Sequence, residues 1–371
     1  MASSSRPEEE RWLTEEWSRR DFLRRGGQGA ALVASSGPLA ALIAACGGAS
    51  GGTGGGSSNN KPATIGWSVA YFDHPVYQLM MKGANQLAAK RGAKITFTDG
   101  KNDPSVQSAD VDNFLAQKVD GIVLTPAVSD PMIPAVKKIN AAKVPFIVVD
   151  RKMFTHGSGI HWAALVGFDM AKSGTIGGQE TVDALKGTPG RLAVVEGTAG
   201  AGSTIERGST FYGIIKQHPE IQVLFKVDGD FKRDKGLTVT ENILQRFPKG
   251  HLDAIYYMND EMALGGLQAI QNTGRLHEFK IISCDGEKEA LDNLRSNGGI
   301  NYDGIFFPQD EGALGASVVL DIVQGKTPDW NNQSWEGRKA FADKFEGMPW
   351  VRTDFYRVDP TNANDPQYIG W

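Results

Sequence analysis

The feature that most constrains the fold of this chain is a repeated alternation of short apolar runs with helical patterns, which begins at Lys61. Such alternation is typical of parallel β-sheets whose strands are joined by crossover helices. The runs follow one another at intervals of roughly 24 to 32 residues, in two sets of four with similar spacing. We therefore expect an α/β fold with two similar doubly wound parallel-sheet lobes. The runs begin near Ile65, Ile95, Ile122 and Phe146, and again near Leu192, Val223, Ile255 and Ile281.

The segment between the first two runs has the period of a helix. Apolar residues recur at spacings of three and four from Val76 to Ala88. Pro75 suits the first turn of a helix, and Gly92 suits the left-handed residue that often follows a helix end. The pattern therefore predicts a helix between Pro75 and Gly92, with its apolar side in the core.

The first 45 residues have the pattern of an export signal. Arg19 and Arg20 stand shortly before Phe22 and Leu23, which resembles a twin-arginine signal. The apolar stretch at 30–45 is short and is interrupted by glycine and proline, so it is unsuited to a stable bilayer span. We expect residues 1–45 to be a twin-arginine-like lipoprotein signal. The sequence leaves open whether export follows the twin-arginine or the general route.

The segment around Cys46 predicts a membrane anchor. Leu42 to Cys46 resembles the site at which bacterial lipoproteins are cleaved and lipidated. The residues that follow, up to Asn60, are nearly all Gly, Ser, Thr and Asn, which cannot bury a core. We therefore expect residues 46–60 to be a flexible tether. The exported chain would hang by lipidated Cys46 from the outer face of the cytoplasmic membrane.

Charge and cysteine usage exclude several classes of function. The net charge of −4, without a basic patch, does not favour nucleic acid as a partner. With Cys46 lipidated, Cys284 has neither a disulfide partner nor enough companions for a zinc site. The turn at 197–204 resembles a phosphate loop, but Ser203 stands where a lysine would reach the phosphates. We expect a monomeric binding protein without metal or cofactor, and not an enzyme, because no nucleophile and base pair is recognisable.

Polar residues follow most of the predicted strands. In open parallel sheets, ligands bind at the carboxyl ends of the strands. Asp, Asn and Thr are also preferred helix N-caps, and we favour that interpretation for Asp130, Asp260 and Glu261. Asp150 differs because Arg151 follows it directly; a surface ion pair is the alternative. The polar residues at these strand ends are Asp73, His74, Thr125, Asp150, Arg151, Asn259, Asp260 and Asp285.

Six motifs together resemble one family of exported binding proteins. Taken together they span most of residues 61–325, and in them the chain is similar to the exported sugar-binding proteins of the ribose-binding type. The motifs are DHPVYQ at 73–78, VVDRK at 148–152, AGSTIERGSTF at 201–211, GDFKRDKGL at 229–237, NDEMALGGLQAI at 259–270 and CDG at 284–286.

The resemblance implies two α/β lobes that are joined by three crossover strands, close on one sugar and deliver it to the permease subunits of an ABC importer. The crossings would lie near Gly167, Phe306 and Trp350. By position, the N-terminal lobe would comprise residues 61–167 with 307–350, and the C-terminal lobe residues 168–306 with 351–371.

The resemblance also implies which residues bind the ligand. His74, Thr125, Val76 and Phe306 depart from the ribose-binding pattern, which has two asparagines, an aromatic residue and a glutamine there. These departures do not favour ribose itself, and they leave a hexose, another pentose or a linear polyol open. The implied ligand-binding residues are Asp150, Arg151, Arg207, Asn259 and Asp285 for hydrogen bonding, Tyr77 and Phe231 for stacking, and His74, Thr125 and Phe306 at the departing positions.

The chemistry of these side chains agrees with a neutral sugar. A sugar offers C–H faces to aromatic rings and a rim of hydroxyls that both donate and accept hydrogen bonds. The acids Asp150 and Asp285 balance Arg151 and Arg207, whereas an amino acid, a nucleotide or a sugar phosphate would need surplus positive charge. We therefore expect a neutral monosaccharide or polyol.

Three other functions share part of this pattern. A sensory binding protein for a chemoreceptor or sensor kinase would have the same ligand chemistry. A regulator related to the lactose repressor would carry a DNA-binding helix pair where this chain has its export signal. An α/β enzyme would need the nucleophile and base that we do not find. Residues 329–347 resemble an insertion and 360–371 extend beyond the usual end of the family, and the sequence assigns neither a role.

Overall fold

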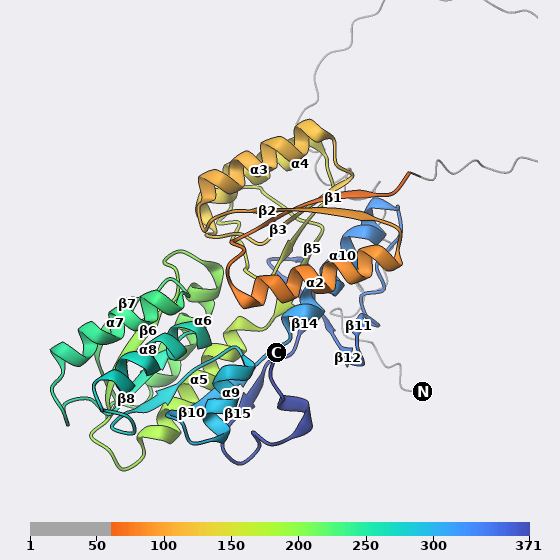
Figure 1. Cartoon of the computed structure of the whole chain (residues 1–371). Coiled ribbons are helices and arrows are strands. Elements are labelled where there is room, and N and C mark those ends of the chain that lie inside the picture. The colour runs from red at the N-terminus through yellow and green to blue at the C-terminus, as the bar shows by residue number, and fades with distance from the viewer. Residues whose placement is uncertain (1–60) are drawn as a thin grey trace, which may run out of the picture.

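The computed structural model describes residues 61–371, so the signal expected at 1–45, lipidation at Cys46 and the tether at 46–60 lie outside the described residues. The described chain forms two α/β lobes, one above the other in Figure 1, with three connections between them. Within 61–371, no helix is long and apolar enough to cross a bilayer.

The N-terminal lobe is built on a seven-stranded sheet with the order β13-β14-β5-β4-β3-β1-β2, parallel except for the pairing of β13 with β14. Helices α2 and α10 pack together on one face, and α3 and α4 cover the other (Figure 1). The elements are β1 (Thr64–Val69), α2 (Pro75–Lys90), β2 (Lys94–Asp99), α3 (Pro104–Gln117), β3 (Gly121–Leu124), η2 (Asp130–Met132), α4 (Ile133–Ala142), β4 (Phe146–Val149), β5 (Ala164–Phe168), α10 (Pro308–Val323), β11 (Ser334–Trp335), β12 (Arg338–Lys339), β13 (Phe341–Phe345) and β14 (Met348–Thr353).

The C-terminal lobe is built on a six-stranded sheet with the order β15-β10-β9-β8-β6-β7, parallel except for the pairing of β10 with β15. Helices α5 and α6 pack as one pair and α7 and α8 as another. The elements are α5 (Met170–Leu185), β6 (Arg191–Glu196), α6 (Gly202–Ile215), β7 (Gln222–Asp228), α7 (Arg233–Arg246), β8 (Ala254–Tyr257), α8 (Asp260–Asn272), β9 (Lys280–Ile282), α9 (Lys288–Arg295), β10 (Ile300–Ile305), β15 (Tyr356–Val358) and η3 (Pro366–Tyr368).

The two lobes share one plan, which confirms the predicted fold class. The order β2-β1-β3-β4-β5 in the first sheet corresponds to β7-β6-β8-β9-β10 in the second. Each of the eight apolar runs that the sequence indicated lies in a strand. The predicted first helix is α2, which has Pro75 at its first position and Gly92 beyond its end at a φ of 62°.

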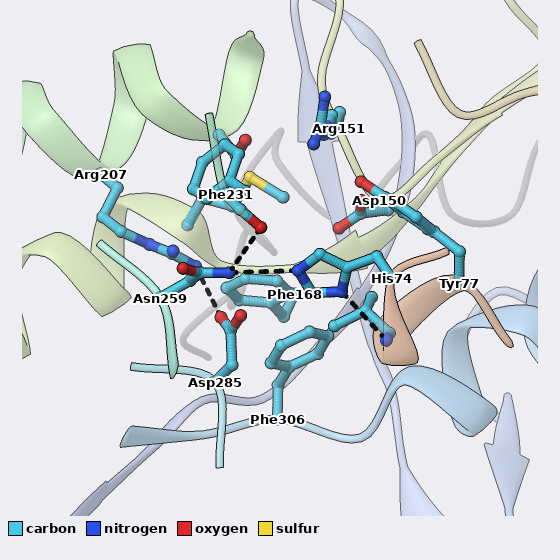
Figure 2. A pocket seen from close by; sticks show the side chains of 13 residues that line it. His74, Tyr77, Asp150, Arg151, Phe168, Arg207, Phe231, Asn259, Asp285 and Phe306 are labelled. Atoms are coloured by element: carbon cyan, nitrogen blue, oxygen red, sulfur yellow. Dashed lines mark hydrogen bonds and ion pairs between the residues drawn. The ribbon is translucent and has the colours of Figure 1, made fainter. Parts of the chain in front are cut away.

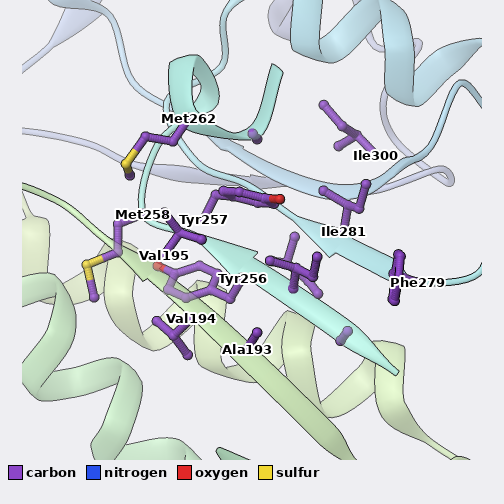
Figure 3. Close-up of a cluster of buried hydrophobic side chains, with 14 of the residues drawn as sticks. Ala193, Val194, Val195, Tyr256, Tyr257, Met258, Met262, Phe279, Ile281 and Ile300 are labelled. Carbon is purple, nitrogen blue, oxygen red and sulfur yellow. The ribbon is translucent and has the colours of Figure 1, made fainter. Parts of the chain in front are cut away.

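The strand β8 shows why these runs are apolar on both sides. Tyr256 and Tyr257 are fully buried, and they point to opposite faces of the sheet (Figure 3). Tyr256 stacks on Phe211 of α6, with ring centroids 4.1 Å apart, whereas the Tyr257 hydroxyl lies 2.8 Å from that of Thr240 in α7. Helices therefore cover both faces, and a strand with one polar face would not be stable here.

The connections between the lobes meet in a stack of three phenylalanines, one from each connection. Phe168 ends β5, Phe306 follows β10, and Phe355 lies between β14 and β15. The ring of Phe168 stacks on those of Phe306 and Phe355, with centroid distances of 4.1 Å and 5.5 Å. The buried carboxyl of Glu311 in α10 accepts hydrogen bonds from the Phe168 N–H and the Thr353 hydroxyl. The third connection therefore begins after Thr353. The sequence placed this crossing near Trp350, but Trp350 lies in β14 and still pairs within the first sheet.

The two segments without an assigned role pack on different lobes. Residues 329–347 form the small β11–β12 hairpin and β13, which extends the edge of the first sheet. Trp330 is buried in the core of that lobe. The last residues run along α9 of the C-terminal lobe, where Arg295 donates hydrogen bonds to the carbonyls of Ala363 and Tyr368.

Candidate functional site

A cavity of about 30 Å³ lies between the lobes, at the carboxyl ends of their strands (Figure 2). All of the ligand-binding residues expected from the sequence except Thr125 line it. The lining side chains are His74, Val76, Tyr77, Asp150, Arg151, Phe168, Met170, Ser203, Arg207, Phe231, Asn259, Asp285 and Phe306.

The first helix presents His74 and Tyr77 to the cavity. His74 is the N-cap of α2, and its Nδ1 accepts a hydrogen bond from the N–H of Val76 at 3.2 Å. Burial, together with the charges of Arg151 and Arg233, lowers the pKa of His74 to about 3. The imidazole is therefore neutral at physiological pH.

The end of β4 presents Asp150 and Arg151. Asp150 has a φ of 66°, and its N–H still bonds to the carbonyl of Val166 in β5 at 2.8 Å. This left-handed turn at the end of the strand aims the carboxyl into the cavity (Figure 2). Burial raises the pKa of Asp150 to about 6, against the opposing effects of Arg151, Arg207 and a hydrogen bond from Tyr77.

The guanidinium of Arg151 is held by carbonyl and aromatic groups. It donates a hydrogen bond to the carbonyl of Ala127 at 2.8 Å. It also lies 5.6 Å from the ring centroid of Tyr71, 5.7 Å from that of Tyr77 and 5.3 Å from that of Phe231. Asp150 and Arg151 are both buried, so they do not form the surface ion pair that is the alternative interpretation of their sequence.

Arg207 of α6 organises the opposite wall of the cavity. Its guanidinium donates to the Ser173 hydroxyl and the Met258 carbonyl, and it pairs with Asp285, with 3.3 Å between Nη2 and Oδ1. Both ion-pair partners are almost completely buried. Burial raises the pKa of Asp285 well above its usual value, although Arg207 opposes that shift.

Asn259 serves both as a helix cap and as a wall of the cavity. Its Oδ1 accepts the N–H of Met262 at the start of α8, and its Nδ2 lies 3.1 Å from Nε2 of His74 in the other lobe. The cap interpretation and the binding interpretation of this residue are thus compatible.

Asp260, for which we favoured a capping role, instead holds the loop that carries Asp285. It is the first residue of α8 and is fully buried. Its Oδ2 accepts the N–H groups of Gly286 and Glu287 at 2.9 and 2.7 Å, and its Oδ1 accepts the Ser283 hydroxyl. Sequence spacing does not reveal this role, because the loop follows β9 and lies more than twenty residues away.

Aromatic side chains cover the cavity from both lobes. Phe231 has a φ of 57°, and its ring lies so close to Gly197 that any side chain at Gly197 would collide with it. The glycine-rich turn after β6 therefore makes room for this ring. Phe306 faces the cavity from the hinge stack with Phe168.

The sequence missed three lining residues and misplaced one. Phe168 and Met170 flank the first connection. Ser203, which in the sequence only takes the place of the lysine of a phosphate loop, has a buried hydroxyl without a protein partner. Thr125 does not line the cavity. Its hydroxyl accepts the indole N–H of Trp67 at 3.1 Å, because the side chain after β3 turns into the core under α2.

Polar contacts join the two lobes at the edge of the cleft. Lys152 of the first lobe and Glu206 of α6 form an ion pair with 2.9 Å between Nζ and Oε1, and both side chains are largely buried. The N–H of Ser129 bonds to the carbonyl of Gly200 at 3.1 Å. A Cβ on Gly202 would collide with the backbone of Lys152, so a glycine is needed for this close approach.

The arrangement suits the binding of a polar ligand. Among residues 61–371, the structure brings no three His, Cys, Asp or Glu side chains together as a candidate metal site. Burial raises the pKa values of the two acids, and a carboxyl group can exchange hydrogen bonds with a hydroxyl in either protonation state. The two arginines donate, and the rings offer stacking faces.

Comparison with known proteins agrees with this geometry. Residues 65–327 match the model of the periplasmic binding protein domain. The chain is 37% identical over 266 residues to the ribose import binding protein of Bacillus subtilis (strain 168), covering 72% of this chain and 83% of that protein. It is 26% identical over 293 residues to the galactofuranose-binding protein of Escherichia coli (strain K12), covering 75% of this chain and 92% of that protein.

A solved structure has the same fold. It is an ABC transporter solute binding protein from Bacillus halodurans C-125 with bound myo-inositol, with a TM-score of 0.72 and 24% sequence identity. The alignment covers 84% of this chain and 99% of that one.

Proposed function

This chain belongs to the periplasmic binding protein family, in its ribose-binding type, and on that premise we propose that it binds a neutral monosaccharide or polyol between its lobes for an ABC importer. The relatives support the ligand class, since one is a ribose import protein, another binds galactofuranose, and the solved neighbour holds myo-inositol. The ligand would bridge the lobes and stabilise the closed form by contacting both.

The observation that carries this proposal is the matched set of polar groups from the two lobes around one cavity. Asp150 and Arg151 face Arg207, Asn259 and Asp285 across it. Two acids and two arginines suit an uncharged ligand with many hydroxyls, because each hydroxyl can donate to a carboxylate and accept from a guanidinium. Both lobes line the cavity, so hinge motion of the lobes would admit the sugar and then enclose it.

Location and partners follow from the family and from the N-terminal sequence. The family implies a site of action outside the cytoplasm. We infer that residues 1–45 direct export, that Cys46 carries a lipid, and that residues 46–60 tether the lobes to the outer face of the cytoplasmic membrane. The permease subunits of an importer are the expected protein partners of the monomer. A sensor of the same sugar remains the alternative function.

A ligand panel tests the proposal. The full chain with Cys46→Ser, which cannot be lipidated, is screened by thermal shift against pentoses, hexoses, inositols and linear polyols. A true ligand at 100 times its Kd stabilises the folded form by about 2.7 kcal/mol. Charged controls, such as a sugar phosphate and an amino acid, should give no shift. The sugar assignment fails if no member of the four neutral classes stabilises the protein.

Import and sensing are separated by a second experiment. The lipidated chain is reconstituted with the permease and ATPase subunits of a candidate sugar importer, and sugar-dependent ATP hydrolysis is measured. Stimulation by the ligand from the panel supports the importer, whereas binding without stimulation points to the sensor.

A further inference from the structure

Trp371 is bound to the loop that presents Asp285 to the cavity. Its indole N–H donates to the carbonyl of Asp285 at 3.0 Å. Its backbone N–H donates to the carbonyl of Gly286 at 3.3 Å, and its carbonyl accepts the N–H of Lys288 at 3.0 Å. Three hydrogen bonds therefore join one residue of the segment after β15 to the loop that follows β9.

Trp371 also contacts the hinge. Its ring meets that of Phe306 edge to face, with centroids 6.0 Å apart. The N–H of Phe306 bonds to the same Asp285 carbonyl that accepts the indole N–H, at 3.3 Å. The ring packs against the cores of both lobes. The indole thus lies directly behind two residues that line the cavity, Asp285 and Phe306.

Gly370 makes this contact possible. It has a φ of 82°, and a Cβ at this position would lie within 2.6 Å of the Cα of Lys288. A larger residue would be strained and would collide with the start of α9. The preceding residue, Ile369, is 64% exposed and has no comparable constraint.

The loop under Trp371 needs such support. Asp285 has a φ of 148°, a conformation that is unfavourable for any residue other than glycine. Strained backbone of this kind persists only where the surrounding contacts hold it. Asp260 holds the loop on the side of Gly286 and Glu287, and Trp371 holds the carbonyl of Asp285 itself.

We propose that Trp371 is a positioning residue of the ligand site, which fixes the Asp285 peptide so that its carboxyl faces both Arg207 and the ligand. The inference rests on the proposed function and deepens it, since it assigns part of the affinity to a segment beyond the residues that match the family model. Trp371 does not line the cavity, and it acts through Asp285 and Phe306.

The first test needs no ligand. In the full chain with Cys46→Ser, Cys284 is the only thiol, and it is buried beside Asp285. Its rate of labelling by a thiol reagent therefore reports opening of this loop. Trp371→Phe, which retains a ring but removes the indole N–H, should raise the rate about three- to tenfold. Gly370→Ala should raise it further, and Ile369→Ser should leave it unchanged. Equal rates in all four proteins overturn the proposal.

The second test separates positioning from general stabilisation. For the best ligand of the panel, Trp371→Phe should weaken Kd about three- to tenfold in the parent chain and less than about twofold in an Asp285→Asn background. Equal losses in both backgrounds mean a merely structural role and overturn the proposal. If no panel sugar binds the parent chain, the proposed function falls and with it the ligand role of Trp371, whereas faster labelling still supports its hold on the loop.

Discussion

The Nε2 atom of His74 lies 3.1 Å from the Nδ2 atom of Asn259, so the N-caps of two helices from opposite lobes meet across the cleft (Figure 2). Each side chain also holds its own helix, His74 through the N–H of Val76 and Asn259 through that of Met262. The contact between the lobes is therefore made by two groups that are already fixed in place. Closure of the cleft costs little side-chain entropy at this point.

His74 should make ligand binding sensitive to acid. Its pKa is lowered to about 3 by burial in the closed form, and it returns toward the ordinary value of 6.5 when the lobes open. Below pH 6.5 opening therefore takes up a proton, and the closed form loses stability as the pH falls. Relative to His74→Asn, which keeps an N-cap residue, the affinity of the parent should fall by up to about tenfold for each pH unit below about 6.

Calorimetric Kd values at pH 7.5, 6 and 5 check this expectation. Asp150, whose pKa is raised to about 6, has the opposite effect, because it takes up a proton in the closed form. It is present in both proteins and cancels in their ratio. Parallel pH profiles for the parent and His74→Asn would show that His74 does not titrate on opening.

Arg207 should dominate the polar affinity of the C-terminal lobe. Arg207→Ala leaves Asp285 buried without its ion-pair partner and removes a donor to the ligand, at a cost of roughly 2–5 kcal/mol in binding. Arg191→Ala is the matched control, because Arg191 pairs with Asp253 in the same lobe but does not line the cavity. Isothermal titration with the panel ligand measures both. An Arg207→Ala protein that remains folded and binds as tightly as the parent would remove Arg207 from the site.

The ion pair between Lys152 and Glu206, at the edge of the cleft, should stabilise the closed form. Lys152 lies over the rings of Trp350 and Phe345 in its own lobe, at 3.9 and 4.6 Å from their centroids, and reaches Glu206 only when the lobes are closed. Glu206→Gln leaves this buried ammonium without a countercharge in the closed form alone. We expect Kd to rise about three- to tenfold, mainly through faster dissociation.

Stopped-flow kinetics and small-angle scattering test whether the Lys152–Glu206 pair stabilises the closed form. The variant should dissociate faster, and its ligand-free form should have a larger radius of gyration than the parent. Asp112→Asn is the control, since it removes an exposed pair with Lys138 within one lobe. Equal effects of the two substitutions would mean that the Lys152–Glu206 pair does not favour closure.

The sequence predicted those parts of the molecule that depend on local pattern. The strands buried on both faces, such as β8, appear as continuous apolar runs, and the polar residues after them end at one edge of each sheet. Thr125 follows the same rule, yet its side chain turns into the core to meet Trp67. Strand position alone does not determine the direction of a side chain in the loop that follows.

Long-range contacts could not be predicted in this way. Phe168 reaches the cavity because three distant connections stack their rings, and no local spacing encodes that meeting. Trp371 contacts a loop 86 positions earlier in the chain. Both residues lie where the family motifs are absent, so neither local physics nor resemblance indicated a role for them.

Glu311 at the hinge should be protonated in the folded protein. Burial raises the pKa of its carboxyl well above 4.5, and Asp150 adds to the shift. Its Oε1 accepts hydrogen bonds from Phe168 and Thr353, and its Oε2 has no partner. The unfolded chain releases the proton near pH 4.5 while the folded chain retains it, so this group makes the protein less stable as the pH rises above that value.

Glu311→Gln keeps the acceptor and carries no titrating group, and should therefore remove this pH dependence. At pH 5 its free energy of unfolding should lie within about 0.5 kcal/mol of the parent, whereas Glu311→Leu loses the acceptor and should cost about 1–3 kcal/mol. Urea unfolding at pH 5 and 8 measures both. If Glu311→Gln destabilises the protein as much as Glu311→Leu at both pH values, the carboxyl is ionised in the hinge.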